Sequence, residues 1–137
     1  MKKIVLISCA SKKLNKRAKA RNIYNSQLFR YNLAYAESLT PDKIFILSAK
    51  HGLLDLDKEI DPYEKTLNKM PKKEIEKWAN EVVEKLREVS DLDKDEFIFL
   101  AGERYRKFIA PKINNYKIPL KGLGIGKQLK FLKGKLK

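Results

Sequence analysis

The stretch Ile44–Leu67, IFILSAKHGLLDLDKEIDPYEKTL, decides how this chain is organised. It opens with the apolar run Ile44–Leu47, which is short, β-branched and aromatic and therefore predicts a buried strand. A buried parallel strand presents its functional groups at its carboxyl end, where the chain enters a crevice. Ser48, Lys50 and His51, the only histidine, follow at that point. The remainder of the stretch shows no helical period, so we predict a packed functional loop.

The loop ends in Asp61-Pro62-Tyr63. Proline restricts its own φ and the conformation of the preceding residue, so the Tyr63 side chain is aimed reproducibly. Two interpretations follow. Tyr63 either lines a pocket at the strand end or closes the loop with a hydrogen bond to backbone.

Apolar runs elsewhere predict three further strands, each followed by a polar or glycine-containing loop. These strands are Lys3–Ser8, Phe97–Leu100 and Tyr116–Ile118. Helical periodicity and helix-start residues predict helices at Gln27–Leu39 after an N-cap at Ser26, from Pro71 to about Val89, from after Tyr105 to about Ala110, and at the C-terminal end. Trp78 lies on the apolar stripe of the second of these, so we predict that it belongs to the core.

Strands that alternate with helices predict an α/β fold, a three-layer sandwich with a four-stranded parallel sheet and helices on both faces. We expect residues 1–137 to form one domain. In such a sheet the four loops after the strands meet at one edge. Side chains that are far apart in the sequence therefore converge there.

The formal net charge is +14, and the charge is unevenly distributed. Residues 1–36 hold nine Lys or Arg and residues 104–137 hold eleven, with no acid in either segment, while 37–103 holds all seventeen acids. Two basic ends around an acidic middle favour one surface that faces a polyanion, and we predict nucleic acid as the partner. The alternative is the charged surface of a thermophile, which predicts mixed signs along the chain.

The sequence predicts no signal peptide and no membrane-spanning segment. A single cysteine excludes an internal disulfide and fits a reducing compartment, so we expect a cytoplasmic protein. The glycine-rich turn before the last helix matches neither the dinucleotide fingerprint nor the Walker pattern. We predict no metal site and no cofactor.

The first loop begins Ser8-Cys9 and continues with Lys12 and Lys13, which suit an anion. Cys9 is either a functional thiol or a small buried hydrophobe. Ser8 and Ser48 each end a strand, so their hydroxyls are expected at the same sheet edge. The predicted pocket residues, which catalyse or read a base, are Ser8, Cys9, Ser48, His51 and Tyr63.

The residues predicted to bind nucleic acid lie mainly in the loops after the strands. They are Lys12, Lys13, Tyr24, Ser26, Lys50, Arg104, Lys121, Gly124 and Lys127. The lysines and Arg104 are expected to contact phosphate. Tyr24 or Tyr63 is expected to stack on a base.

Six segments together carry a resemblance to an uncharacterised-domain family of bacteria and archaea: LISCASKKL, IYNSQLF, ILSAKHGLL, DPYEKTL, LAGERY and PLKGLGIGKQLKFL. More remotely, ILSAKHGLL with DPY resembles a segment of YaaA-type peroxide-stress proteins, which bind DNA and have an aromatic at the position of His51. The first loop, with the following Tyr and Ser, is similar to the core domain of archaeosine synthase, a tRNA-modifying enzyme. These resemblances imply the architecture of the uracil-DNA glycosylase superfamily, with strand order 2-1-3-4.

Three functions stay open. The chain acts on a nucleobase in DNA or RNA, for which a pocket at the strand ends and a basic rim are needed. Alternatively, it is a non-catalytic DNA- or RNA-binding stress protein. In the third alternative the protein binds a small molecule, a free nucleobase or nucleotide. The oligomeric state does not follow from the sequence.

Overall fold

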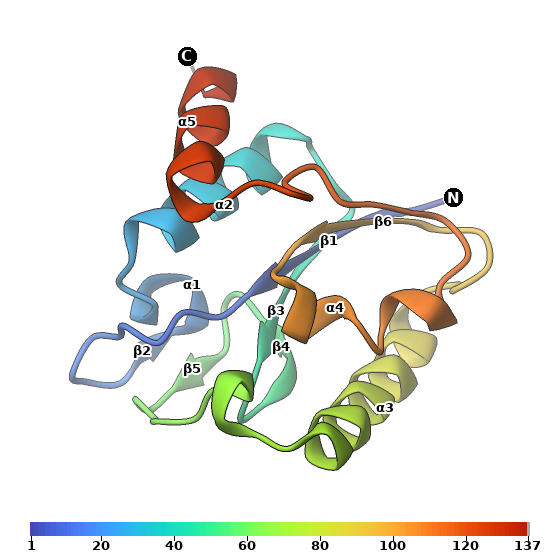
Figure 1. Ribbon diagram of the computed structural model, residues 1–137, viewed down its shortest axis with the longest axis horizontal. Coiled ribbons are helices and arrows are strands. Elements are labelled where there is room, and N and C mark those ends of the chain that lie inside the picture. The colour runs from blue at the N-terminus through green and yellow to red at the C-terminus, as the bar shows by residue number, and fades with distance from the viewer. Residues whose placement is uncertain (137) are drawn as a thin grey trace.

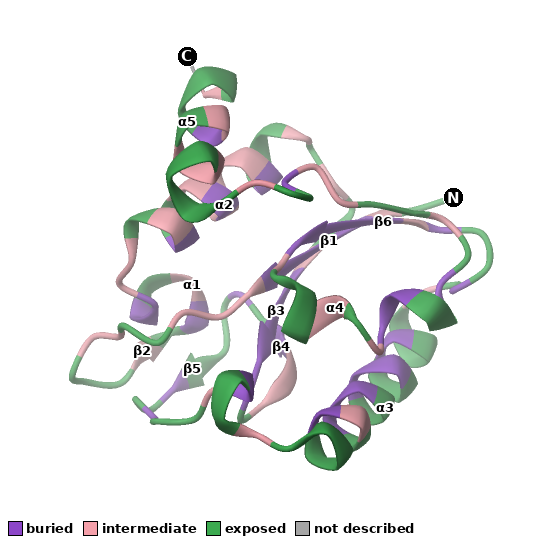
Figure 2. Cartoon of the chain, viewed as in Figure 1, coloured by how far each residue is buried: buried purple, intermediate pink, exposed green. Residues whose placement is uncertain are grey.

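Three continuous apolar runs form the centre of the sheet: β1 (Lys3–Ser8), β3 (Lys43–Ser48) and β6 (Glu96–Leu100). In the computed structural model, which describes residues 1–136, most of their side chains are buried (Figure 2). Burial on both faces explains why these strands read as unbroken apolar runs instead of alternating with polar residues.

The sheet has five strands in the order β4-β3-β1-β6-β7. The neighbours β3-β1, β1-β6 and β6-β7 (Tyr116–Lys117) are parallel, and β4 (Gly52–Asp55) is antiparallel to β3. The four predicted strands therefore occur in the order 2-1-3-4. The prediction of a purely parallel, four-stranded sheet is wrong, because the chain turns back after Ser48 and adds β4 as a hairpin partner.

Helices flank both faces of the sheet (Figure 1). On one face lie α1 (Ala20–Ile23), α2 (Gln27–Ser38) and α5 (Ile125–Lys135). On the other face lie α3 (Lys72–Val89) and α4 (Glu103–Arg106), with the 3-10 helices η1 (Leu67–Lys69) and η2 (Ala110–Lys112). The residues of β1 divide between two cores, Ile4 and Leu6 packing with α3 and Val5 and Ile7 with α2.

Local signals for the two long helices are confirmed. The Ser26 side chain caps α2 and accepts a hydrogen bond from the Phe29 N–H at 3.1 Å. Pro71 precedes the first residue of α3. Trp78 is 6% exposed and packs in the core, as predicted.

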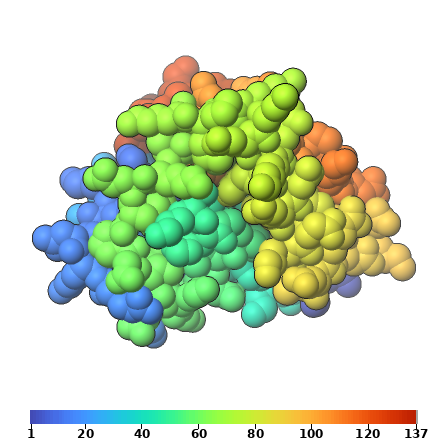
Figure 3. All heavy atoms as spheres, turned by 90° about the horizontal axis from the view of Figure 1, so that it is seen from below, coloured from blue at the N-terminus to red at the C-terminus, as the bar shows by residue number. Residues whose placement is uncertain are grey.

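The predicted packed loop contains a further strand besides β4. The two-residue strands β2 (Ala18–Lys19) and β5 (Glu59–Ile60) pair antiparallel and join the basic N-terminal loop to the segment after β4. Arg17 adds an ion pair to Asp61 at 3.1 Å. Figure 3 shows the green segment lying beside the blue N-terminal loop on one side and the yellow-green α3 on the other.

None of the helices within residues 1–136 combines the length and apolar character that a membrane crossing requires.

Candidate functional site

The carboxyl ends of β1, β3, β6 and β7 lie at one edge of the sheet because these strands are parallel. The chain leaves β1 toward α2 on one face and leaves β6 toward α4 on the other (Figure 1). Neighbouring strands whose connections depart to opposite faces leave a crevice between them, the topological switch point of an open α/β sheet. This point lies between Ser8 and the residues after Leu100.

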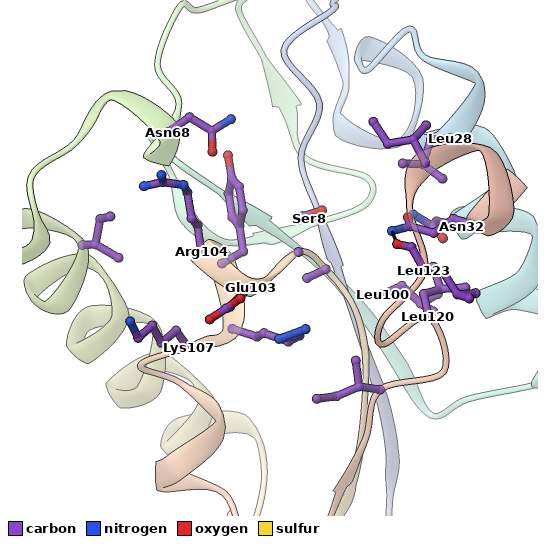
Figure 4. Close-up of a pocket in the computed structure, with 18 of the residues that line it drawn as sticks. Ser8, Leu28, Asn32, Asn68, Leu100, Glu103, Arg104, Lys107, Leu120 and Leu123 are labelled. Carbon is purple, nitrogen blue, oxygen red and sulfur yellow. Dashed lines mark hydrogen bonds between the residues drawn. The ribbon is translucent and has the colours of Figure 1, made fainter.

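A cavity of about 790 Å³ occupies this position. Its size falls in the range of pockets that bind small ligands. We call it the switch-point cavity. Figure 4 shows Ser8 between two walls, with Glu103, Arg104 and Lys107 on one side and Leu28, Asn32 and Leu123 on the other.

The α4 wall is mainly cationic. Lys72, Arg104, Arg106 and Lys107 line it, with Glu103 as the one carboxylate among the described residues around the cavity. Cations gathered on one wall repel one another, so the wall favours an anionic ligand.

The α2 wall is apolar except for amides. It consists of Leu28, Asn32, Leu120, Leu123 and Gln128, contributed by α2, the loop after β7 and α5. Asn32 is only 4% exposed, and its Oδ1 is buried without a hydrogen-bond partner. Buried polar atoms are nearly always paired, so this acceptor beside the cavity is open to a donor, either an ordered water or a ligand.

A separate hydrogen-bonded cluster lies beneath the loop after β3, and we call it the tyrosine clasp. The Tyr63 hydroxyl is hydrogen-bonded to the hydroxyls of Tyr24 (2.7 Å) and Ser48 (2.8 Å). Ser48 Oγ also accepts from the His51 N–H at 3.0 Å, and Trp78 Nε1 donates to the Ser48 carbonyl at 2.8 Å. These bonds join three segments that are distant in the sequence.

Burial sets the ionisation of the clasp. It raises the pKa of Tyr24 to about 12 and also raises the pKa of Tyr63, so both hydroxyls stay protonated near neutral pH. Burial, together with the charges of Lys50 and Lys58, lowers the pKa of His51, which favours the neutral ring.

Two lysines cover the clasp. Lys13 Nζ lies 4.3 Å from the centroid of the Tyr63 ring, and Lys50 Nζ lies 5.9 Å from it. Partial burial lowers the pKa of Lys13. Tyr24 and Tyr63 are 1% and 8% exposed, so neither ring is open for stacking on a base.

Cys9 lies at the boundary between the two cores, where it packs against both. Its Sγ donates a hydrogen bond to the Tyr105 hydroxyl at 3.4 Å. This packing favours the interpretation of Cys9 as a small, partly buried hydrophobe.

The family model of a family of unknown function (DUF6884) matches residues 4–134. The chain belongs to this family. The predicted membership of an uncharacterised-domain family is thus confirmed at that level. A comparison with curated proteins and with solved structures finds no match to the chain, so the likeness to YaaA-type proteins and to archaeosine synthase stays a prediction.

In this DUF6884 chain the predicted pocket residues do not line one common pocket. Ser8 lines the switch-point cavity, whereas Ser48, Tyr63 and the His51 N–H form the clasp. The separation has a simple cause, because the Tyr63 ring and its hydrogen bonds fill the space at the end of β3.

The predicted nucleic-acid residues divide in the same way. Arg104 lines the switch-point cavity, and Lys13, Tyr24 and Lys50 belong to the clasp or cover it. Ser26 and Gly124 are the N-caps of α2 and α5. Lys12, Lys121 and Lys127 are exposed in or beside the loops that follow β1 and β7.

Sequence reasoning missed Asn32, Arg106, Lys107 and Gln128. A signal for Asn32 was present, because it lies four residues from both Leu28 and Ala36 and so interrupts the apolar stripe of α2. Arg106 and Lys107 follow Arg104 in a charged segment that shows neither a helical nor a strand period. Their place at the cavity depends on the turn after β6.

Proposed function

We propose that this chain binds nucleic acid and holds one nucleotide of it in the switch-point cavity. The observation that carries the proposal is the pairing of a cationic wall with an apolar, amide-bearing wall across one cavity. A nucleotide has the same division, since its phosphate is anionic and its base is flat, largely apolar and edged with hydrogen-bonding groups.

The two walls suggest an orientation for that nucleotide. The α4 wall, with Arg104, Arg106 and Lys107, suits the phosphate. The α2 wall suits the base, because Leu28 and Leu123 offer apolar contact and Asn32 offers an acceptor that lacks a partner. The exposed Lys12, Lys121 and Lys127 would contact the flanking backbone.

A base enters such a cavity only after it has left its stack, so the substrate is a single strand or a flipped nucleotide. Modification or repair of a nucleobase in DNA or RNA is the reaction class that fits this requirement. Glu103, the carboxylate at the cavity, is the candidate general base. The strand order and the helices on both faces support assignment to the uracil-DNA glycosylase-like class of folds.

Binding of fluorescent oligonucleotides tests the proposal. We expect single-stranded DNA or RNA to bind more tightly than a duplex of the same sequence, and Asn32→Leu to weaken that binding. Equal affinity for single strand and duplex, unchanged by Asn32→Leu, would contradict the cavity as the binding site.

The alternatives predict different results. A protein whose ligand is a free nucleotide would bind mononucleotides and would not bind oligonucleotides. A non-catalytic nucleic-acid-binding protein would bind strands but leave every base unaltered when bound strands are digested and analysed by mass spectrometry.

A further inference from the structure

The arginines of this chain separate into two groups by their partners. Four of the six have an acidic or amide side-chain partner: Arg17 with Asp61, Arg21 with Asp57 and Glu37, Arg30 with Asn25, and Arg87 with Glu84. Within residues 1–136, Arg104 and Arg106 make no ion pair and no side-chain hydrogen bond. Both of these unpaired arginines line the switch-point cavity.

Arg106 is the more constrained of the two. Arg106 is half-buried, and its Nε is buried without a hydrogen-bond partner. A guanidinium N–H that is removed from water and left unpaired is unfavourable for the unliganded protein. A ligand that accepts a hydrogen bond from it removes this cost, which favours binding. Nε and one Nη of arginine together form the fork that grips two oxygens of a phosphate.

The surroundings add positive charge to this fork. Lys107 is adjacent in sequence, and Lys72 approaches the cavity from the start of α3 on a different element. Glu103 is the only acid on the cavity lining among the described residues. Four cations against one carboxylate suit a ligand with more than one negative charge.

We infer that the α4 wall is a subsite for a terminal phosphomonoester, so that the cavity receives the phosphorylated end of a nucleic-acid strand. The inference rests on the proposed function and narrows its substrate. A phosphomonoester carries roughly two negative charges near pH 7 and three terminal oxygens. A backbone phosphodiester carries one charge and two such oxygens, which leaves the second arginine without a matching acceptor.

The experiment compares one oligonucleotide sequence with a 5′-phosphate, with a 3′-phosphate and with hydroxyls at both ends. We expect one phosphorylated form to bind on the order of tenfold more tightly than the hydroxyl form, the size of a charge-assisted contact. Inorganic phosphate should remove that preference while binding of the hydroxyl form persists. Equal affinity of all three forms overturns the inference but leaves the proposed function intact, whereas absence of binding by all three overturns both.

Variants locate the subsite. Arg104→Gln changes an exposed side chain, so it tests the subsite without risk to the fold, and Arg106→Gln tests the half-buried fork. Both should abolish the preference for the phosphorylated end, and Arg106→Lys should restore part of it. Arg87→Gln, on the outer face of α3 and paired with Glu84, is the matched control. A preference that survives in both cavity variants contradicts the assignment to Arg104 and Arg106.

Discussion

At the scale of single residues, Asn32 differs from the other two polar or charged residues that are buried within residues 1–136. Asp95 and Ser48 are as deeply buried, but their side chains have hydrogen-bond partners, whereas Asn32 Oδ1 has none. A group that is unfavourable for folding is retained when binding needs it, so stability and function are expected to change in opposite directions at Asn32.

Asn32→Leu should raise the free energy of unfolding by about 1 kcal/mol, because it removes an unpaired buried acceptor and adds a better helix former. The same variant should weaken oligonucleotide binding. Urea denaturation and fluorescence anisotropy measure the two effects. Asn80→Leu, on the exposed face of α3, is the control and should leave binding unchanged. A destabilised Asn32→Leu would mean that the amide has a partner in solution.

Tyr63 has the contrasting role. The sequence leaves open whether it lines a pocket or closes a loop, and its burial and two hydroxyl partners favour closing the loop, through side chains instead of backbone. Tyr63→Phe should lower the free energy of unfolding by about 2 kcal/mol, because the buried Tyr24 hydroxyl is left unpaired. Tyr31→Phe, which loses only a long contact from Gln27, should change it little. If Tyr63→Phe lowers the free energy of unfolding no more than Tyr31→Phe does, the hydrogen bonds of the clasp do not stabilise the fold.

Stability at high pH follows from the same tyrosines. The pKa values of Tyr24, Tyr63 and Tyr105 are raised by burial above the ordinary value of 10.0, and that of Tyr24 lies at about 12. Above pH 10 the unfolded chain loses these protons before the folded chain does, so their contribution is complete below pH 10 and declines from there to about pH 12 and beyond. Each buried tyrosine adds a slope of up to about 1.4 kcal/mol per pH unit. The free energy of unfolding, measured by urea denaturation above pH 10, should fall less steeply with pH in Tyr63→Phe than in the unaltered chain. Equal slopes in the two proteins would contradict this expectation.

At the scale of elements, the turn between β3 and β4 decides which strands the sheet contains. Ser48 pairs with Gly52, so Ala49, Lys50 and His51 form a short hairpin loop. Gly52 follows it with φ +69°, a left-handed conformation that side chains with a Cβ adopt only with strain. Glycine therefore reverses the chain into β4 with the least strain at this position.

Gly52→Ala should destabilise the fold by about 1 kcal/mol through backbone strain, since the added Cβ would meet only Val82 at an ordinary 3.8 Å. Gly134→Ala is the matched control within α5, where an added Cβ meets nothing within 4 Å and should stabilise by about 0.5 kcal/mol. Chemical denaturation of the two variants should therefore give shifts of opposite sign. Shifts of the same sign would contradict the strain at Gly52.

At the scale of the whole molecule, the two basic ends of the chain meet near one edge of the sheet. Lys12 and Lys13 follow β1, Arg104 and Lys107 follow β6, and Lys121 and Lys127 follow β7. At the opposite edge Lys43 begins β3, and Lys94 and Lys112 precede β6 and β7. The proposed function depends on this difference between the edges and not on net charge alone.

Replacing Lys12, Lys121 and Lys127 together by Gln should reduce the salt dependence of single-strand binding. Each lost phosphate contact lowers the slope of log affinity against log salt by about 0.7, so the triple variant should lose about 2. The control replaces Lys43, Lys94 and Lys112 by Gln and should keep the original slope. Similar losses in both variants would mean that charge acts only as a diffuse field.

The sequence by itself determined the elements whose signals are local. Unbroken apolar runs identified β1, β3 and β6, the stripe from Ile75 to Leu86 identified α3, and Ser26 marked the start of α2. These features depend on residues within a few positions of one another. The uneven charge could likewise be counted from the chain, and the expected parallel strands predicted that the basic loops after them lie at one edge of the sheet.

Only the tertiary structure decided the fifth strand, the small β2-β5 sheet and the division of the predicted pocket into a cavity and a clasp. Two-residue strands are too short to show a period, and β4 depends on pairing with β3. Tyr24 and Tyr63 meet across 39 positions, so their hydrogen bond has no local signal. The missing partner of Asn32 is likewise a property of the packed surroundings, because which buried groups stay unpaired is known only when every neighbour is in place.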